Sequence, residues 1–333
     1  MQLLFEVHKH RSDILLKGLL ALASVALLLF ANPGVARDDG TVNLVFVHSQ
    51  TSAPYLNFIE KVQRELQAGS RFPVHTLSLP ASQLDEERST GTTPSADMIV
   101  ALGKQAARAI QQWQPDVPVL YALIPRTTYD SLGKSGDLAC PGKQCTAIYI
   151  DQPLQRIFHI LTAAFGKQQR LGVVLGPASS WQQDALVKLA GQTGYALHTV
   201  KIHERDELLP ALDGILKQSD LLLSLADPVV YNRRTAKSIL LTTYRYKVPV
   251  VAYSRAYADA GATLSVFSTP GQIARQTASV IRDFFSSHEQ GLPQPQYPEH
   301  YKIRVNRHVA DSLGLDFENK PEFQSIIKEA DDE

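Results

Sequence analysis

The sequence predicts an α/β protein of two Rossmann-like lobes with parallel sheets joined by a hinge. Short apolar runs alternate with helical patterns along most of the chain, and each run ends in small or polar residues. Such alternation implies right-handed crossovers and parallel strands. About ten strands are more than one ordinary sheet holds. An eightfold barrel is the competing architecture, but the long break at 126–144 favours two halves over eight even units.

Most predicted strands are short apolar or β-rich runs, and the predicted helices repeat apolar residues every three or four positions. The strands are Val42–Val47, Val74–Leu79, Asp97–Leu102, Val117–Ile124, Thr146–Ile150, Leu171–Leu175, Ala196–Ile202, Leu221–Leu225, Val248–Ala252 and Tyr301–Val305. The helices are Pro54–Leu66, Gly103–Gln112, Pro153–Phe165, Trp181–Gly191, Asp206–Gln218 and a final one carrying Ile273, Thr277, Val280 and Phe284. We expect a surface loop at Arg126–Gln144 and a charged, loosely ordered tail from Lys320.

The first 36 residues resemble a secretory signal. Arg11 and Lys17 precede the apolar run Gly18–Phe30, and small residues follow up to Ala36. This order predicts export and cleavage after Ala36. An uncleaved membrane anchor is the alternative, but the run is shorter than the ~20 residues that a spanning helix needs. We therefore expect a periplasmic protein.

Charge and cysteine content exclude several classes of protein. The 33 basic residues equal the 33 acidic ones, so nothing favours nucleic acid or an anionic membrane surface as a partner. The two cysteines, Cys140 and Cys145, flank a Pro-Gly turn, and an exported protein meets oxidising conditions. We expect a local disulfide that staples this loop and has no catalytic role.

The segment from Leu225 to Ala278 resembles the signature of ABC-transporter substrate-binding proteins with the type I periplasmic binding fold. It contains an Asp-containing loop, a Val-Pro-Val strand, a Gly-Ala turn and a helix rich in Ala and Gln. The resemblance covers most of Val42–Leu315 and is strong over Arg170–Phe285. It implies three hinge crossings and a ligand enclosed between two lobes. Some members of the family bind amino acids, including aromatic ones.

By this analogy the chain divides into a signal peptide and two interleaved lobes. Residues 1–36 form the signal, 41–148 plus 262–290 the first lobe, 149–261 plus 291–315 the second, and 316–333 the tail. Three loops depart from the amino-acid binders of the family. The loop after the first strand lacks a His-Pro pair, Gly176-Pro177 stands where Asn-Pro is usual, and Ser268-Thr269 replaces a frequent Tyr. The resemblance therefore supports the fold and leaves the ligand open.

Four loops are expected at the carboxyl ends of strands, where open parallel sheets bind ligands. They are His48–Tyr55, Gly103–Gln105, Gly176–Trp181 and Asp227–Tyr231. With the loop after the Val-Pro-Val strand, they supply the candidate ligand-binding residues Ser49, Thr51, Tyr55, Gly103, Lys104, Ser179, Ser180, Trp181, Asp227, Tyr231, Ser254 and Tyr257. Each serine is alternatively a plain N-cap and Asp227 a cap, and the rings of Tyr55 and Trp181 alternatively fill the core of their own lobes.

Catalytic patterns are missing from the sequence. It has no Gly-x-Ser-x-Gly elbow and no Gly-x-Gly-x-x-Gly after a strand, and His198 and His203 lack the i, i+4 spacing of a helical metal pair. We expect no enzyme activity, no cofactor and no metal. The prediction is a periplasmic solute-binding protein that captures a small molecule, such as an amino acid or small organic acid, for a membrane permease. The alternatives are a sensory ligand-binding protein for a signalling receptor and an exported α/β hydrolase-like enzyme.

Overall fold

The computed structural model describes residues 40–84, 95–134, 144–287 and 291–332. The chain divides into two units, Met1–Thr41 and Val42–Glu333, and the fold below is that of the second unit. The expected signal peptide at 1–36 lies outside the described residues, as does Cys140, so the signal and the Cys140–Cys145 disulfide stay predictions. No helix in the described part of the chain has the length and apolar character needed to span a membrane.

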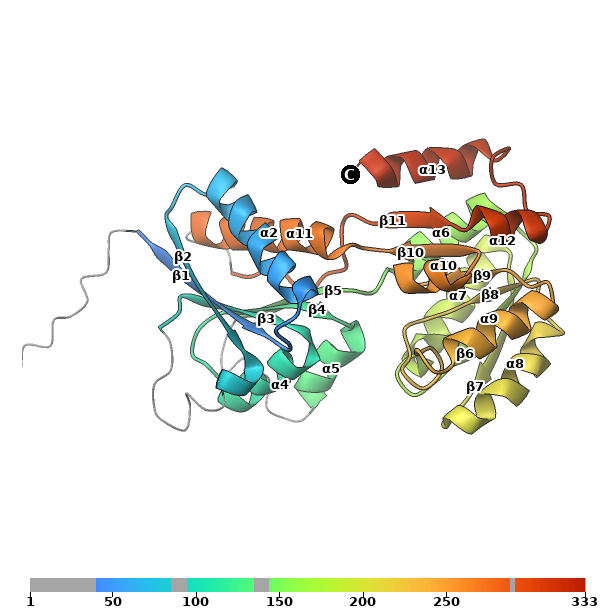
Figure 1. The fold of residues 1–333 in the computed structure, drawn as a ribbon, viewed down its shortest axis with the longest axis horizontal. Helices are drawn as coiled ribbons and strands as arrows, with labels where there is room; N and C mark the ends of the chain where they lie inside the picture. Colours follow the sequence, from blue (N-terminus) through green and yellow to red (C-terminus); the bar gives the residue numbers. More distant parts are fainter. Residues whose placement is uncertain (1–39, 85–94, 135–143, 288–290, 333) are drawn as a thin grey trace, which may run out of the picture. The chain divides into compact units, whose positions relative to one another are not determined.

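The first sheet has five parallel strands in the order β2-β1-β3-β4-β5. They are β1 (Val42–His48), β2 (Val74–Pro80), β3 (Met98–Leu102), β4 (Val119–Ile124) and β5 (Cys145–Tyr149). Helices α2 (Ala53–Gly69) and α11 (Pro270–Ser286) cover one face, and α4 (Gly103–Trp113) and α5 (Arg126–Lys134) cover the other (Figure 1). Because side chains alternate along a strand, Leu44 and Phe46 join the α2 face, whereas Val45 and Val47 join the α4 face.

The second sheet has six strands in the order β11-β10-β9-β8-β6-β7, and β11 is antiparallel to β10. The strands are β6 (Arg170–Leu175), β7 (Ala196–Lys201), β8 (Leu221–Leu223), β9 (Val250–Ala252), β10 (Leu264–Phe267) and β11 (Lys302–Val305). One face packs on α6 (Leu154–Phe165), α7 (Gln183–Thr193) and α13 (Pro321–Asp332), and the other on α8 (Leu208–Leu216), α9 (Ala236–Arg245) and α10 (Arg255–Ala260). Three short helices complete the set: η1 (Ser180–Gln182), η2 (Arg205–Glu207) and α12 (Arg307–Ser312).

Three chain segments connect the two sheets: the link from β5 to α6, the link from β10 to α11, and the stretch before β11. Side chains tie these segments together. Gln152 Nε2 donates to Ser268 Oγ at 2.8 Å, and that hydroxyl donates to the His300 carbonyl at 2.6 Å. Arg156 Nη1 donates to Gln152 Oε1 at 2.7 Å and to the Pro298 carbonyl at 2.9 Å. The crossings therefore behave as one hydrogen-bonded bundle.

Two predicted irregular segments are helical. Arg126–Lys134 forms α5, whose first backbone N–H is held by the Asp151 carboxylate at 2.6 Å and whose Leu132 is buried. The charged tail contains α13, because Phe323, Ile326 and Ala330 make a buried stripe at i, i+3 and i+7. The prediction of a loosely ordered tail was therefore wrong, as was the loop prediction over 126–134, while 135–143 of the predicted loop lie outside the described residues.

The strand β10 was missed, and it moves one boundary between the lobes. Leu264 and Ser265 pair with β9 in the second sheet, so this part of the chain returns to the first sheet after Phe267 and not at 262. The run from Thr263 to Phe267 is short and contains Ser265, which masked its strand character. The helix that follows, α11, packs beside α2 on the first sheet (Figure 1).

Candidate ligand-binding pocket

A pocket of about 470 Å³ opens at the carboxyl ends of β4, β8, β9 and β10, beside the link from β5 to α6. Its apolar wall consists of Leu123, Ile150, Ile157, Leu223, Leu225, Tyr253, Phe267 and Ile273. Its polar groups are Asp151, Gln152, Gln182, Ser224, Ser254, Arg255, Ser268 and Thr269. A mainly apolar cavity with a few placed polar groups is the usual form of a small-molecule site.

Asp151 is the acidic residue among those that line the pocket. Its side chain is half-buried, and Oδ2 accepts the backbone N–H of Arg126 at 2.6 Å. Burial raises the pKa of the Asp151 carboxyl, and the hydrogen bond from Arg126 opposes that rise. The basic lining residue, Arg255, is exposed and pairs with Asp259 at 3.5 Å. The interior of the pocket thus offers a carboxylate to a ligand and suits an ammonium group.

The start of helix α6 provides a partial positive charge, which complements the negative charge of Asp151. The helix α6 begins at Leu154 behind Pro153, with no side chain capping its first N–H groups. Gln152 and Ile157, on either side of this start, line the pocket. Uncapped N–H groups at the positive end of a helix dipole favour a carboxylate. By contrast, the start of α11 is occupied by its own capping box between Thr269 and Gln272.

Of the predicted ligand-binding residues, Ser254 lines this pocket. Its hydroxyl also accepts the Tyr257 N–H at 3.4 Å as the N-cap of α10. The neighbouring Tyr253, which was not predicted, forms part of the wall. Burial and the nearby Asp227 and Asp151 carboxylates raise the pKa of Tyr253 to about 12, so its hydroxyl remains protonated at neutral pH.

Five predicted residues of the first lobe lie in or just after the loops that follow β1 and β3, and none of them lines the pocket. Ser49 Oγ accepts the N–H groups of Gln105 and Ala106, both at 3.0 Å, and therefore caps α4 from another loop. The Tyr55 hydroxyl and Ser49 lie against Gly103, which has φ +83°. Thr51 and Lys104 are exposed beside them; they are predicted ligand residues that do not line the pocket.

Asp227 and Ser179 form a structural lock between two loops. Asp227 is 2% exposed. Its Oδ2 accepts from Ala178 N and Ser179 N at 2.9 Å each and from Ser179 Oγ at 3.0 Å. Its Oδ1 accepts from Val229 N at 2.9 Å and Val230 N at 3.3 Å. The carboxylate is thus saturated by its own loops, and the nearby Ser180 hydroxyl donates to the Pro177 carbonyl at 3.5 Å.

Tyr231 and Tyr257 point into the core of the second lobe. Both are buried, and their rings pack edge to face with centroids 6.0 Å apart. Burial raises the pKa of both hydroxyls well above the ordinary tyrosine value. The Tyr231 hydroxyl has no hydrogen-bond partner among the described residues. Their place in the core indicates packing, and they do not line the pocket.

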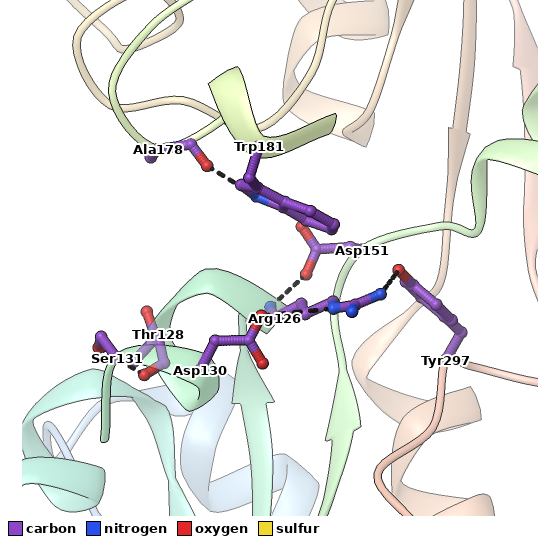
Figure 2. Close-up of polar contacts among 8 residues, drawn as sticks. All are labelled: Arg126, Thr128, Asp130, Ser131, Asp151, Ala178, Trp181 and Tyr297. Atoms are coloured by element: carbon purple, nitrogen blue, oxygen red, sulfur yellow. Dashed lines mark hydrogen bonds and ion pairs between the residues drawn. The ribbon is translucent and has the colours of Figure 1, made fainter. Parts of the chain in front are cut away.

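Trp181 is 44% exposed, and its ring stacks on the side chain of Arg126. The Arg126 guanidinium carbon lies 4.6 Å from the Trp181 ring centroid, and Trp181 Nε1 donates to the Ala178 carbonyl at 3.1 Å (Figure 2). Its neighbour Gln182 lines the pocket. Trp181 therefore lies next to the pocket, with one face already covered by Arg126.

Sequence reasoning missed most of the polar lining. Asp151 and Gln152 follow a predicted strand and precede Pro153, which is the same signal that selected the other loops. Ser268 and Thr269 were noticed only as a departure from relatives. Arg126 was placed in a surface loop. No group of three or more His, Cys, Asp or Glu side chains in the described part of the chain is arranged to hold a metal ion.

Comparison with known proteins agrees with this architecture. A substrate-binding protein with adhesive properties from Clostridium difficile superposes with a TM-score of 0.64 at 16% identity, covering 83% of this chain and 95% of that one. An ABC domain from Streptococcus pneumonia in complex with L-tryptophan gives a TM-score of 0.59 at 16% identity, covering 87% and 98%. A conserved domain protein from Vibrio cholerae gives a TM-score of 0.57 at 18% identity, covering 83% and 95%.

These likenesses confirm the predicted two-sheet α/β fold. A search of curated protein sequences finds no match. The family profile described as ABC transporter substrate binding protein matches residues 91–329, which is most of the chain. This match confirms the resemblance found at Leu225–Ala278 and the solute-binding function inferred from it. The chain belongs to the ABC transporter substrate-binding protein family.

Proposed function

We propose that this protein binds a small amine-bearing solute, foremost an amino acid, in the pocket and delivers it to a membrane permease. The observation that carries the proposal is Asp151, a half-buried carboxylate in a pocket with mostly apolar walls. A carboxylate in such surroundings gains most when a cation pairs with it. The predicted secretory signal fits a protein that works in the periplasm.

The pocket complements the three parts of an amino acid. Asp151 suits the ammonium group, the uncapped start of α6 suits the carboxylate, and the apolar wall suits a side chain. The pneumococcal ABC domain described above was solved with L-tryptophan, a ligand of this class. A volume of about 470 Å³ is within the range of small-ligand sites. The crossings beside the pocket would let the lobes close on the solute by hinge motion.

A thermal-shift series tests both the function and the ligand class. L-tryptophan, L-leucine, tryptamine, indole-3-propionate and D-xylose are compared at increasing concentration. An amino acid at about 100 times its dissociation constant stabilises the protein by about 2.7 kcal/mol. Tryptamine keeps part of the shift, because it retains the amine, and indole-3-propionate loses it. A melting temperature raised by D-xylose and by none of the amines would exclude the proposed ligand class.

A pair of variants assigns the effect to the pocket. Asp151→Asn removes the charge and keeps an oxygen for the Arg126 N–H, so the amino-acid shift should disappear while the fold persists. Asp184→Asn is the control, since Asp184 is exposed in the first turn of α7 and does not line the pocket. Equal ligand shifts in wild type and Asp151→Asn would show that the solute binds elsewhere.

A further inference from the structure

Arg126 joins parts of the chain that belong to different sheets. It starts α5, next to β4 of the first sheet, and its guanidinium lies over Trp181, which follows β6 of the second sheet. Its Nη1 donates to the Tyr297 hydroxyl at 3.0 Å, in the segment before β11, and its backbone N–H is held by Asp151 (Figure 2). Through its side chain and its backbone N–H, this one residue thus links both sheets with two of the crossings between them.

Residues other than Trp181 hold the Arg126 guanidinium in place. The Tyr297 ring centroid lies 6.0 Å from the guanidinium carbon, and Asp130 Oδ2 accepts from Nε at 3.4 Å. Tyr297 is itself held edge to face against Tyr149, with centroids 5.4 Å apart. A planar guanidinium stacks on aromatic faces and donates in its own plane at the same time. The Arg126 side chain is therefore preorganised, and Trp181 docks on its free face.

We propose that Arg126 and Trp181 form a clamp that holds the segments after β4 and β6 together beside the pocket. Gln182, next to Trp181, and Asp151, bonded to Arg126, both line the pocket, so the clamp closes where a solute would bind. Hinge opening separates segments of different sheets and breaks the stacking contact, whereas closure restores it. The clamp biases the ligand-free protein toward closure. Arg126 is thus a positioning residue, which acts through Trp181.

The stacking contact sets the expected size of the effect. Depending on how far it is shielded from water, a cation–π contact changes an equilibrium constant about 2-fold at an exposed site and up to about 30-fold at a desolvated one. Arg126→Gln should shift the ratio of closed to open molecules toward the open form by this factor. Arg126→Lys keeps the charge but loses the planar group, so it should fall between wild type and Arg126→Gln.

Distance measurement in the ligand-free protein tests the clamp. Spin labels are placed at Gln112 on α4 and Lys188 on α7, both exposed, through a keto amino acid that leaves the cysteines untouched. The distance distribution is compared for wild type, Arg126→Gln and the control Arg64→Gln. Arg64 is exposed and pairs with Glu60 at 3.8 Å, much as Arg126 pairs with Asp130. The clamp predicts a broader, longer distribution for Arg126→Gln alone.

Chemical rescue separates a stacking clamp from a merely structural arginine. In Arg126→Ala, added methylguanidinium should refill the gap beside Trp181 and restore the wild-type distances, while methylammonium should not. In a Trp113→Phe background, quenching of Trp181 fluorescence by acrylamide should rise in Arg126→Ala and fall again with methylguanidinium. Circular dichroism confirms that each variant is folded.

The result that overturns the clamp is an Arg126→Gln distribution that matches wild type, or an equal shift in Arg64→Gln. Rescue by methylammonium to the same extent would also overturn it, because charge alone would then explain the effect. The inference rests on the proposed pocket, yet these measurements need no ligand. A protein that shows the clamp and is not stabilised by any amine would refute the ligand class and leave the clamp standing.

Discussion

Replacing Asp227 by alanine should destabilise the fold, because this buried carboxylate locks two loops. The substitution leaves four backbone N–H groups and the Ser179 hydroxyl without their acceptor. Removing one side of a buried charged network costs about 3–5 kcal/mol. Water that enters the gap offsets part of this loss, so we take about 4 kcal/mol as the expected loss in the free energy of unfolding.

The size of the folded unit converts this loss into a melting temperature. Unfolding entropy is about 2.1 cal/mol/K per residue, or about 0.6 kcal/mol/K for a unit such as Val42–Glu333. The melting temperature of Asp227→Ala should therefore fall by about 5–8 °C, measured by calorimetry or circular dichroism. Asp184→Ala, at an exposed position, should change it by less than about 1 °C.

Ligand binding decides between this role and a direct contact. If Asp227 is a lock, residual folded Asp227→Ala should still bind the solute, with affinity reduced mainly through the disordered loops. A variant that melts like wild type and loses binding completely would refute the structural reasoning. It would restore the sequence-based prediction that Asp227 contacts the ligand.

Three further predictions follow from the same geometry. Burial raises the folded-state pKa of Asp151, so ionisation of its carboxyl lowers the stability of the fold as the pH rises from about 4 through the raised pKa. Asp151→Asn should therefore melt at a higher temperature than wild type at pH 7 but not at pH 3.5. A difference in melting temperature that is the same at both pH values would contradict this. Gly103→Ala should lower the free energy of unfolding, measured with urea, by about 1–3 kcal/mol, because φ of Gly103 is +83° and the new Cβ would meet the Tyr55 hydroxyl. The control Gly191→Ala, in open space on a helix, should raise it by up to about 1 kcal/mol. Equal effects of the two substitutions would mean that Gly103 is unstrained. Tyr231→Phe removes a buried hydroxyl that has no hydrogen-bond partner among the described residues, so neither the melting temperature nor the affinity for the solute should fall. A loss of affinity would mark Tyr231 as a ligand contact.

Periodicity in the sequence was sufficient to predict most elements of both sheets. Runs such as Leu44–Val47 and Leu171–Leu175 are buried on both faces, so their apolar character is continuous and easy to read. Amphipathic elements were harder. The helix α13 lies where the sequence predicts a charged tail, because its buried positions, Phe323, Ile326 and Ala330, lie among polar and charged residues.

Sequence-based site prediction is hardest where a polar residue has two possible roles. The sequence correctly marked the loops after strands, but a serine or aspartate in such a loop serves equally as a cap or as a ligand contact. Ser49 caps α4, and Asp227 is saturated by its own loops. Asp151 and Ser254 line the pocket. Only the position of neighbouring donors distinguishes these cases, and those donors lie up to 57 residues away in the chain.

The sequence by itself determined the fold class and the family, because both depend on local patterns that repeat along the chain. Hydrophobic alternation, turn residues and the Leu225–Ala278 motif are all read within short windows. The tertiary structure decided which polar groups remain available to a solute and where the lobes touch. The stacking of Arg126 on Trp181 brings together residues from different sheets, and no local pattern encodes that contact. Long-range packing therefore determined the site, whereas local periodicity determined the scaffold.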